Sequence, residues 1–226
     1  DSNTATTLTG AATSIVSHPL SQNAPTSFSI EGWFQTSSTS GGRILGFGDT
    51  QTGTSGVADR TVYMTTAGKL SFGVISGSTV TGTKTTITSN SAYNDGQWHH
   101  VVATQSSAGM RLYVDASVVA TNSQTSAQNY TGYWRIGGDT TWGSTSAYFN
   151  GQLDEAAVYS TALSGARVRA HYEAAMGPIQ NTPPSAGFTV SAADLAVSFD
   201  ASSSFDPDGQ VVGYAWDFGD GATASG

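Results

Sequence analysis

Two pairs of neighbouring residues carry side chains that could do acid–base or metal chemistry. His99 and His100 follow Trp98, and Asp154 stands beside Glu155. Adjacent residues of a strand point to opposite faces of a sheet, so neither pair converges on one substrate atom or one metal ion. We expect one histidine to pack beside Trp98 and the other to face solvent or a hydrogen-bond partner.

Other catalytic patterns are missing from the sequence. A glycosidase needs two carboxylates facing each other across a cleft, about 5 to 9 Å apart, and no strand carries such a pair. There is no nucleophile elbow, phosphate-binding loop or His-Glu-x-x-His helix. The sequence therefore predicts no catalytic residues and a protein that is not an enzyme.

A three-stranded meander is predicted to position the histidines. Residues 98–105, 110–115 and 118–121 are rich in β-branched and aromatic residues, and the second run alternates polar with apolar positions. Short glycine-bearing or polar turns join them. Further strands are predicted over residues 12–17, 28–34, 43–47, 60–65, 70–75, 85–88, 133–137 and 148–159, and one helix over residues 166–175 after an N-cap at Ser164.

The composition limits the classes of partner. Charged residues make up 11 % of the 226 residues and the net charge is −8, so nucleic acid and anionic membranes are not expected to bind. The chain has no cysteine, which excludes disulfides and thiolate metal sites. No apolar run is long enough to span a membrane, and Asp1 is read as either a mature or an artificial N-terminus. The acidity fits either divalent-cation binding or simple solubility.

A proline-rich break divides the chain. Residues 181–185, Asn-Thr-Pro-Pro-Ser, have no periodicity, and we predict a domain over residues 1–177, a linker over 178–185 and a second module over 186–226. The second module is expected to hold strands at residues 188–190, 196–199 and 211–218. It is too short to stabilise itself without disulfides or metal, so it is expected to be truncated or completed from outside.

The first domain resembles the bacterial laminin G-like (concanavalin A-like) jelly-roll family. The motifs that carry the resemblance are Phe28-Ser-Ile-Glu-Gly-Trp-Phe34, Asp95-Gly-Gln-Trp-His-His-Val-Val102, Arg111-Leu-Tyr-Val-Asp115, Trp134-Arg-Ile-Gly-Gly138 and Phe149-Asn-Gly-Gln-Leu-Asp-Glu155. One departure is Ala116, where the family usually has glycine; we expect the turn to survive with altered geometry. The second module resembles the first half of a PKD domain, through Phe199-Asp-Ala-Ser202, Ser204-Phe-Asp-Pro-Asp-Gly209 and Tyr214-Ala-Trp-Asp-Phe-Gly-Asp-Gly221.

The resemblance implies an all-β fold. We expect a two-sheet antiparallel jelly-roll sandwich with one short C-terminal helix, followed by an incomplete Ig-like β-sandwich module. It also implies calcium at the sheet rim, because relatives hold Ca²⁺ with loop carboxylates and carbonyls. The matching candidates are Asp49, Asp59 and Asp139 in the first domain and Asn181, Asp206 and Asp208 in the second. The alternative is that these side chains cap turns.

Ligand binding is expected in a loop. Trp142 lies in a polar stretch and could offer a stacking surface to a sugar, with Tyr130 and Tyr133 close by in sequence. The alternative is that Trp142 covers the edge of the sandwich. The other tryptophans of strand motifs, Trp33, Trp98 and Trp216, are predicted to be structural.

Together these features predict a non-catalytic extracellular binding or adhesion module that recognises a glycan or a surface protein, as part of a larger multidomain protein. The alternatives are a structural component of a cell-surface or phage appendage, and an accessory domain of a secreted hydrolase. The expected cofactor is Ca²⁺, and the expected location is secreted, cell-surface or virion-surface.

Overall fold

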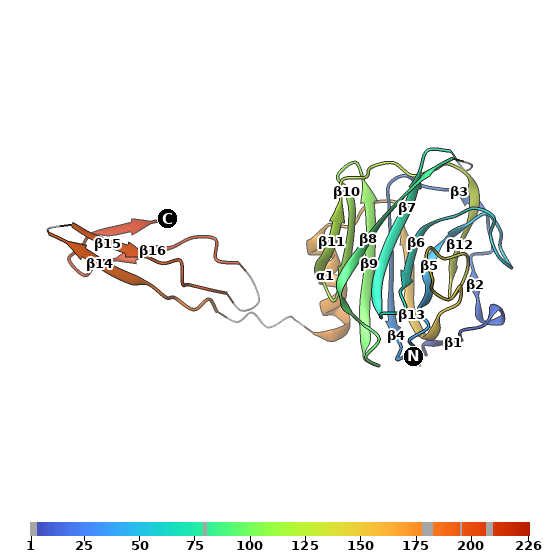
Figure 1. Cartoon of the computed structure of the whole chain (residues 1–226), viewed down its shortest axis with the longest axis horizontal. Coiled ribbons are helices and arrows are strands. Elements are labelled where there is room, and N and C mark those ends of the chain that lie inside the picture. The colour runs from blue at the N-terminus through green and yellow to red at the C-terminus, as the bar shows by residue number, and fades with distance from the viewer. Residues whose placement is uncertain (1–3, 79–80, 178–182, 195, 207–209) are drawn as a thin grey trace. The chain divides into compact units, whose positions relative to one another are not determined.

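The computed structural model describes residues 4–78, 81–177, 183–194, 196–206 and 210–226. The chain forms two compact units, Asp1–Met176 and Gly177–Gly226, which are described separately (Figure 1). No helix among the described residues has the length and apolar character needed to cross a membrane.

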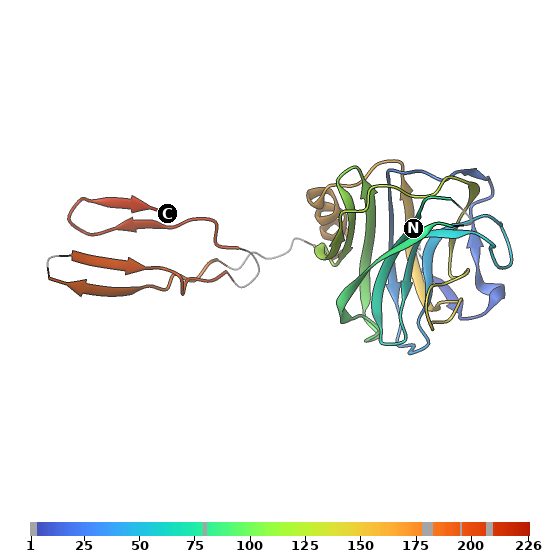
Figure 2. The same cartoon turned by 45° about the horizontal axis from the view of Figure 1, so that its top comes forward.

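The first unit is a sandwich of two antiparallel sheets (Figures 1 and 2). Sheet A has the strand order β1-β13-β4-β9-β10-β11, and sheet B has the order β2-β12-β5-β6-β7-β8 with β3 also pairing to β12. The strands are β1 (Thr6–Thr9), β2 (Val16–Ser17), β3 (Gln22–Asn23), β4 (Phe28–Gln35), β5 (Gly42–Gly48), β6 (Ala58–Met64), β7 (Lys69–Ser76), β8 (Thr83–Ala92), β9 (Trp98–Ser106), β10 (Gly109–Val114), β11 (Ser117–Asn122), β12 (Thr131–Ile136) and β13 (Asn150–Tyr159). The predicted all-β jelly-roll sandwich is confirmed.

The core lies between the sheets and follows the alternation of the strands. In β4, Phe28, Ile30 and Phe34 point inward and are at most 1 % exposed. The Phe28 ring meets Phe72 of sheet B edge-on, with 6.1 Å between ring centroids. Such inward rows from both sheets make one apolar layer, which is what the period of two in the sequence indicates.

The predicted meander forms β9, β10 and β11. Asp115 and Ala116 make the two-residue turn between β10 and β11, with φ angles of 48° and 67°. Both positions are in the left-handed region, as in the hairpin turns that twist with a sheet. Alanine costs more than glycine there, because its Cβ crowds the backbone.

Helix α1 (Gly165–Met176) covers the outer face of sheet A. It begins where expected, since the Arg167 N–H reaches the Ser164 hydroxyl at 3.3 Å. Val168 of the helix is fully buried in a small cluster with Val102 and Tyr113 of the sheet. Tyr172 of the helix also stacks on Trp33 of β4, with 5.6 Å between ring centroids. The helix is therefore attached by these apolar contacts and by the polar contacts described below.

Two predicted strands differ in the structure. Residues 12–17 form a 3-10 turn, η1 (Ala12–Ser14), before the short β2, because the chain crosses here from sheet A to sheet B. In the second unit the predicted strand over 211–218 is confined to β16 (Ala215–Asp217). Among the described residues, β16 pairs with β17 (Thr223–Ser225) alone, and this pairing covers just three residues of the predicted strand.

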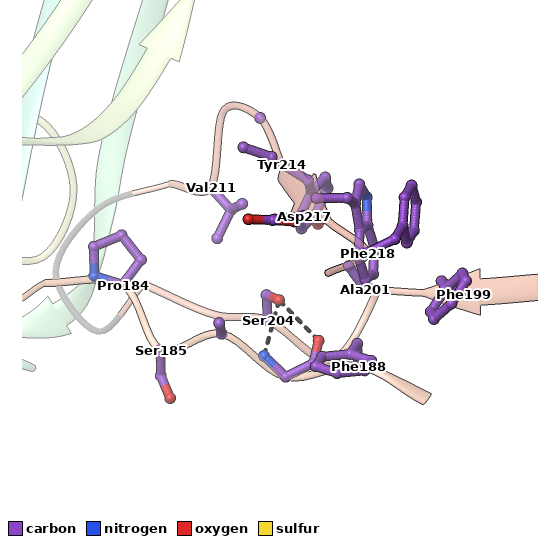
Figure 3. A pocket seen from close by; sticks show the side chains of 15 residues that line it. Pro184, Ser185, Phe188, Phe199, Ala201, Ser204, Val211, Tyr214, Asp217 and Phe218 are labelled. Atoms are coloured by element: carbon purple, nitrogen blue, oxygen red, sulfur yellow. Dashed lines mark hydrogen bonds between the residues drawn. The ribbon is translucent and has the colours of Figure 1, made fainter. Parts of the chain in front are cut away.

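The second unit consists of two hairpins, β14–β15 and β16–β17, with β14 at Thr189–Ala193 and β15 at Ala196–Asp200 (Figure 2). Trp216 lies between Phe188 and Phe199, 5.6 Å from each ring centroid. These rings and Phe218 border an apolar pocket of about 470 Å³, where the Ser204 hydroxyl bonds to the backbone of Gly187 (Figure 3). Phe188 stays 59 % exposed, so the aromatic cluster is only half covered.

Candidate functional site

Asp139, a predicted calcium ligand, is the counterion of two buried arginines. Its carboxylate lies 2.9 Å from the Arg135 guanidinium and 3.7 Å from that of Arg43, and all three side chains are fully buried. Ser55, 84 residues away, donates both its N–H and its hydroxyl to the same carboxylate. A calcium ion there would have to displace these donors. Burial lowers the pKa of Arg43, and Asp139 opposes that shift.

Asp59, a second predicted calcium ligand, is also fully buried. Its carboxylate pairs with the Arg60 guanidinium at 2.8 Å and accepts the Ile75 N–H at 2.8 Å. Burial raises the pKa of Asp59, while the neighbouring Arg60 works to lower it. Arg60 also donates to the carbonyls of Pro25 and Gln128, so this pair ties three segments together inside the sandwich.

The remaining calcium candidates are placed differently. One carboxylate oxygen of Asp49 is shielded from solvent and has no hydrogen-bond partner. Asp206 is part of the described second unit, whereas Asn181 and Asp208 lie outside the described residues. Within the described part of the chain, no group of three or more histidine or acidic side chains is arranged to hold a metal ion. Calcium binding stays a prediction.

The aromatic candidates do not form a common surface. Trp142 is only 7 % exposed: its ring lies against Gly73 of β7, and the Lys84 ammonium stands 5.2 Å from the ring centroid. Tyr130 packs against the Phe47 ring instead and donates its hydroxyl to the Phe47 carbonyl. Tyr133 is partly buried in β12, and no ring contact joins it to the other two among the described residues. A sugar-binding role for these three residues stays a prediction. The structure shows no exposed ring face at Trp142 for a sugar to stack on.

The two histidines point to opposite faces, as their adjacency requires. His99 bonds to Asp115 at 2.7 Å, and this contact raises the pKa of His99. His100 bonds to Glu31 at 2.7 Å and stacks on Trp33, with 4.9 Å between ring centroids. The expected neighbour Trp98 is thus replaced by Trp33, which is the residue opposite His100 on β4.

Glu31 joins helix α1 to sheet A. His171 of the helix meets its Oε1 atom at 2.9 Å, the same oxygen that His100 contacts at 2.7 Å. Burial alone would raise the pKa of Glu31, but hydrogen bonds from His100, Tyr159 and His171 outweigh it and lower the pKa to about 2. An ionised, saturated carboxylate under a helix is a poor general acid or base. The cluster is therefore an attachment point of the helix.

A polar cleft of about 480 Å³ opens at the end of the sandwich where β4 stops and β13 starts. Every residue that lines it is neutral and, apart from two glycines, carries a hydroxyl or a carboxamide. The lining residues are Gln35, Thr36, Ser37, Ser38, Thr39, Ser40, Gly96, Asn150, Gly151 and Gln152. Carboxamides and hydroxyls both donate and accept hydrogen bonds, so this surface can match the hydroxyl groups of an uncharged polar ligand.

Hydrogen bonds inside the protein hold the walls of the polar cleft. The Thr36 hydroxyl donates to the Asn150 carbonyl at 2.6 Å, and the Gln35 amide donates to the Gly96 carbonyl at 2.8 Å. Gly151 leaves no space for a side chain, because its Cα faces the Gln35 carbonyl. Asn150 and Gln152 sit two residues apart on β13, so their exposed side chains share one face.

The loop predicted to bind ligand borders the polar cleft rather than forming it. The Ser146 N–H of that loop donates to the Ser40 carbonyl at 3.0 Å. The cleft residues themselves were not predicted from the sequence. A signal exists in the unbroken hydroxyl run of residues 36–40 between two strands, but hydroxyl-rich turns are common in this chain.

The sandwich with its short helix, and the aromatic hairpins after the linker, define a lectin-like module joined to an Ig-like one. Residues 9–169 match the family model of the concanavalin A-like lectin/glucanases superfamily (Laminin_G_3), and the chain belongs to this superfamily. Residues 181–226 match the PKD domain model. The two resemblances seen in the sequence are confirmed. No curated protein matches the chain.

Solved structures share the sandwich fold. The SAP-like pentraxin of Limulus polyphemus is 18 % identical, with a TM-score of 0.53 over 72 % of this chain and 78 % of the pentraxin. Domains LG4-5 of the mouse laminin α1 chain are 21 % identical, with a TM-score of 0.52 over 71 % of this chain and 44 % of the laminin fragment. The CBM40 of the Ruminococcus gnavus IT-sialidase is 20 % identical, with a TM-score of 0.49 over 63 % of this chain and 80 % of the CBM40 chain. At these identities, the likeness to the pentraxin and to the laminin domains shows the fold alone.

Proposed function

We propose that the first unit is a non-catalytic module that binds neutral glycans in the polar cleft. The observation that carries the proposal is the lining of the cleft, which consists of neutral hydrogen-bonding side chains and glycines. Lectin-like membership of the superfamily supports it.

The chemistry of the cleft favours sugars without charge. None of its lining residues can form an ion pair with a carboxylate or sulfate. The neighbouring charges are acidic, since Asp95 precedes Gly96 and Asp154 lies two residues after Gln152. Sialylated and sulfated glycans are therefore expected to bind more weakly than neutral ones, through both missing attraction and weak repulsion.

Affinity is expected to be modest. None of the lining residues is aromatic, so hydrogen bonds have to supply most of the binding energy. About four net hydrogen bonds of about 1 kcal/mol each correspond to a dissociation constant of about 1 mM. Several copies of such a module, or a repetitive glycan, would raise the apparent affinity.

A glycan panel read by isothermal titration tests the proposal. Asn150→Ala and Gln152→Ala are expected to weaken binding of neutral oligosaccharides about fivefold to tenfold each, whereas Asn129→Ala, at an exposed asparagine away from the cleft, should leave it unchanged. Loss of binding in Trp142→Ala together with unchanged binding in Asn150→Ala would move the site to the Trp142 loop. Hydrolysis of any tested glycan would contradict the non-catalytic assignment.

The same proposal includes a setting and a cofactor. Laminin G and PKD domains are typical of extracellular proteins, which supports a secreted or surface-exposed module within a larger protein.

Calcium is proposed at Asp49, whose shielded carboxylate oxygen lacks a hydrogen-bond donor. At a calcium concentration ten times the dissociation constant, the free energy of unfolding should rise by about 1.4 kcal/mol. The rise should vanish with chelator and in Asp49→Asn, and no rise in the unaltered chain would remove the proposal.

A further inference from the structure

His99 is held between two carboxylates that come from different turns. Its Nδ1 atom lies 2.7 Å from Asp115 in the turn after β10, and its Nε2 atom lies 3.2 Å from Asp95 in the loop before β9. An ionised carboxylate only accepts hydrogen bonds, so the ring can donate to both only when both of its nitrogens carry protons. The geometry is therefore that of an imidazolium ion between two anions.

The two aromatic rings that also pack on His99 carry no charge at neutral pH. The ring centroid of Phe34 of β4 lies 5.6 Å from that of His99, and Tyr93, directly after β8, lies 5.0 Å away. Burial and the Asp115 charge raise the pKa of Tyr93, so its hydroxyl stays neutral. The hydrogen bond to Asp115 raises the pKa of His99, and the contact with Asp95 adds to that shift. Both carboxylates therefore favour the protonated ring.

The contact with Asp95 is the weaker of the two. The Asp95 side chain is 57 % exposed and the Asp115 side chain 29 %, and Asp115 also accepts the N–H of His100. A neutral ring keeps one proton, and the shorter, less exposed contact with Asp115 retains it. The Nε2 lone pair then faces a carboxylate oxygen of Asp95. Deprotonation of His99 thus replaces an attraction by a repulsion at this loop.

Asp95 belongs to a loop, residues 94–97, that contributes Gly96 to the wall of the polar cleft. Three hydrogen bonds join the loop to the cleft residues of the segment after β4: the Gly96 N–H to the Thr36 carbonyl at 3.0 Å, the Gln35 amide to the Gly96 carbonyl at 2.8 Å, and the Asn94 amide to the Ser38 carbonyl at 3.2 Å. On its other side, the Asp95–His99 contact holds the loop to β9. The state of His99 is thus connected to the position of the cleft wall.

We propose that His99 is a positioning residue of the polar cleft, which holds the 94–97 loop in its binding position when protonated and releases it when neutral. This inference rests on the proposed binding of neutral glycans in that cleft. Because the pKa of His99 is raised on folding, the contribution of the contact is present at lower pH and is lost as the pH rises through that pKa. Above it, the wall spends less time in its binding position, and the apparent affinity falls by the same fraction.

Amide hydrogen exchange of the ligand-free 226-residue chain tests the release of the loop. The readout is the protection factor of the Gly96 N–H, in which division by the intrinsic rate removes the ordinary pH dependence of exchange. Between about pH 6 and about pH 9, this protection is expected to fall about threefold, which is the size of an exposed ion pair. The Gly137 N–H, which donates to the Ile44 carbonyl of sheet B, should keep its protection.

Isothermal titration with the neutral oligosaccharide that binds best in the glycan panel gives the second readout. Its affinity for the unaltered chain is expected to fall about threefold over the same pH range. His99→Gln and Asp95→Asn should bind it at both ends of the range as weakly as the unaltered chain does at the higher pH. His18→Gln, at an exposed histidine outside the lining of the polar cleft, should keep the full response.

The two variants support each other, because Asp95→Asn changes an exposed side chain and keeps an oxygen for the Gln97 N–H, so it is expected to fold. Unchanged protection of Gly96 would overturn the proposal, as would a pH response that persists in both variants. Equal glycan affinity at both pH values would contradict this inference but leave the proposed function intact. No glycan binding at any pH would instead remove the proposed function, and the pH control of binding with it.

Discussion

The two outer faces of the sandwich are both covered over buried polar groups, but they use different chemistry. On sheet A, helix α1 is joined through Glu31 to His100 and His171. On sheet B, loops are joined through Asp139 to Arg43 and Arg135. On sheet A one carboxylate meets two imidazoles, whereas on sheet B one carboxylate meets two guanidinium groups, which keep their charge at every pH at which proteins fold. Removal of the carboxylate is thus expected to cost more on sheet B, because it leaves fixed positive charges buried and unpaired.

The largest effect is expected on sheet B. Asp139→Asn leaves two fully buried guanidinium groups without their carboxylate and should lower the free energy of unfolding by about 3 to 5 kcal/mol. Denaturant unfolding at neutral pH measures it. Asp154→Asn is the control, because the Asp154 carboxylate accepts the backbone N–H of its own neighbour Glu155. A loss below 1 kcal/mol at Asp139 would mean that the arginines are satisfied by carbonyl groups alone.

The next effect should expose the pH response of sheet A. Glu31→Gln is expected to cost about 1 to 3 kcal/mol at pH 7, through weakened hydrogen bonds to both histidines. Because the pKa of Glu31 falls from 4.5 to about 2 on folding, its contribution is present above pH 4.5 and is lost as the pH falls toward 2. Urea unfolding at several acidic pH values should show this loss in the unaltered chain and a flatter profile in the variant.

A surface pair on the same helix provides the control for Glu31. Glu173 meets Arg169 at 2.8 Å with both side chains partly exposed, so Glu173→Gln should cost less than about 0.5 kcal/mol. If Glu31→Gln and Glu173→Gln gave the same pH profile, the helix would not be held through Glu31.

The packing of the Trp142 loop on sheet B can be tested separately. An added Cβ at Gly73 would collide with the Trp142 ring, so Gly73→Ala should destabilise the chain by about 1 to 3 kcal/mol and shift tryptophan fluorescence to the red. In a Trp142→Ala background the same substitution should cost much less. Additive costs in the double variant would contradict the packing of this ring on Gly73.

The smallest effect is a gain on the sheet A side. Ala116→Gly should stabilise the chain by about 0.5 to 1 kcal/mol, because Ala116 has a φ of 67°. The carboxylate of its neighbour Asp115 bonds to the His99 ring and accepts the N–H of His100. Relief of backbone strain in the turn is therefore expected to stabilise the strand that carries His100 as well. Ala108→Gly, at a hairpin position without a positive φ, should bring no gain in the same thermal melts.

Local patterns in the sequence predicted most of the strands, the helix and the two family memberships correctly. Alternation in residues 28–34 and 110–115 fixes which side chains face the core, since a strand has a period of two. The adjacency of His99 and His100 already excluded a shared site. Strand periodicity and residue adjacency are local features. They predict which way a side chain points regardless of where the segment lies in the fold.

The roles of the polar residues depend on contacts that exist only in the folded chain. From the sequence, Asp139 is predicted to be a calcium ligand in a loop. In the structure, its carboxylate is instead bonded to Ser55, which is 84 residues away, and to two arginines. From the sequence, Trp142 is predicted to offer an exposed ring. In the structure, Gly73 of a distant strand packs against that ring. The polar cleft likewise arises where segments meet that are far apart in sequence. Hydrogen bonding and burial depend on such neighbours, and composition and spacing do not encode them.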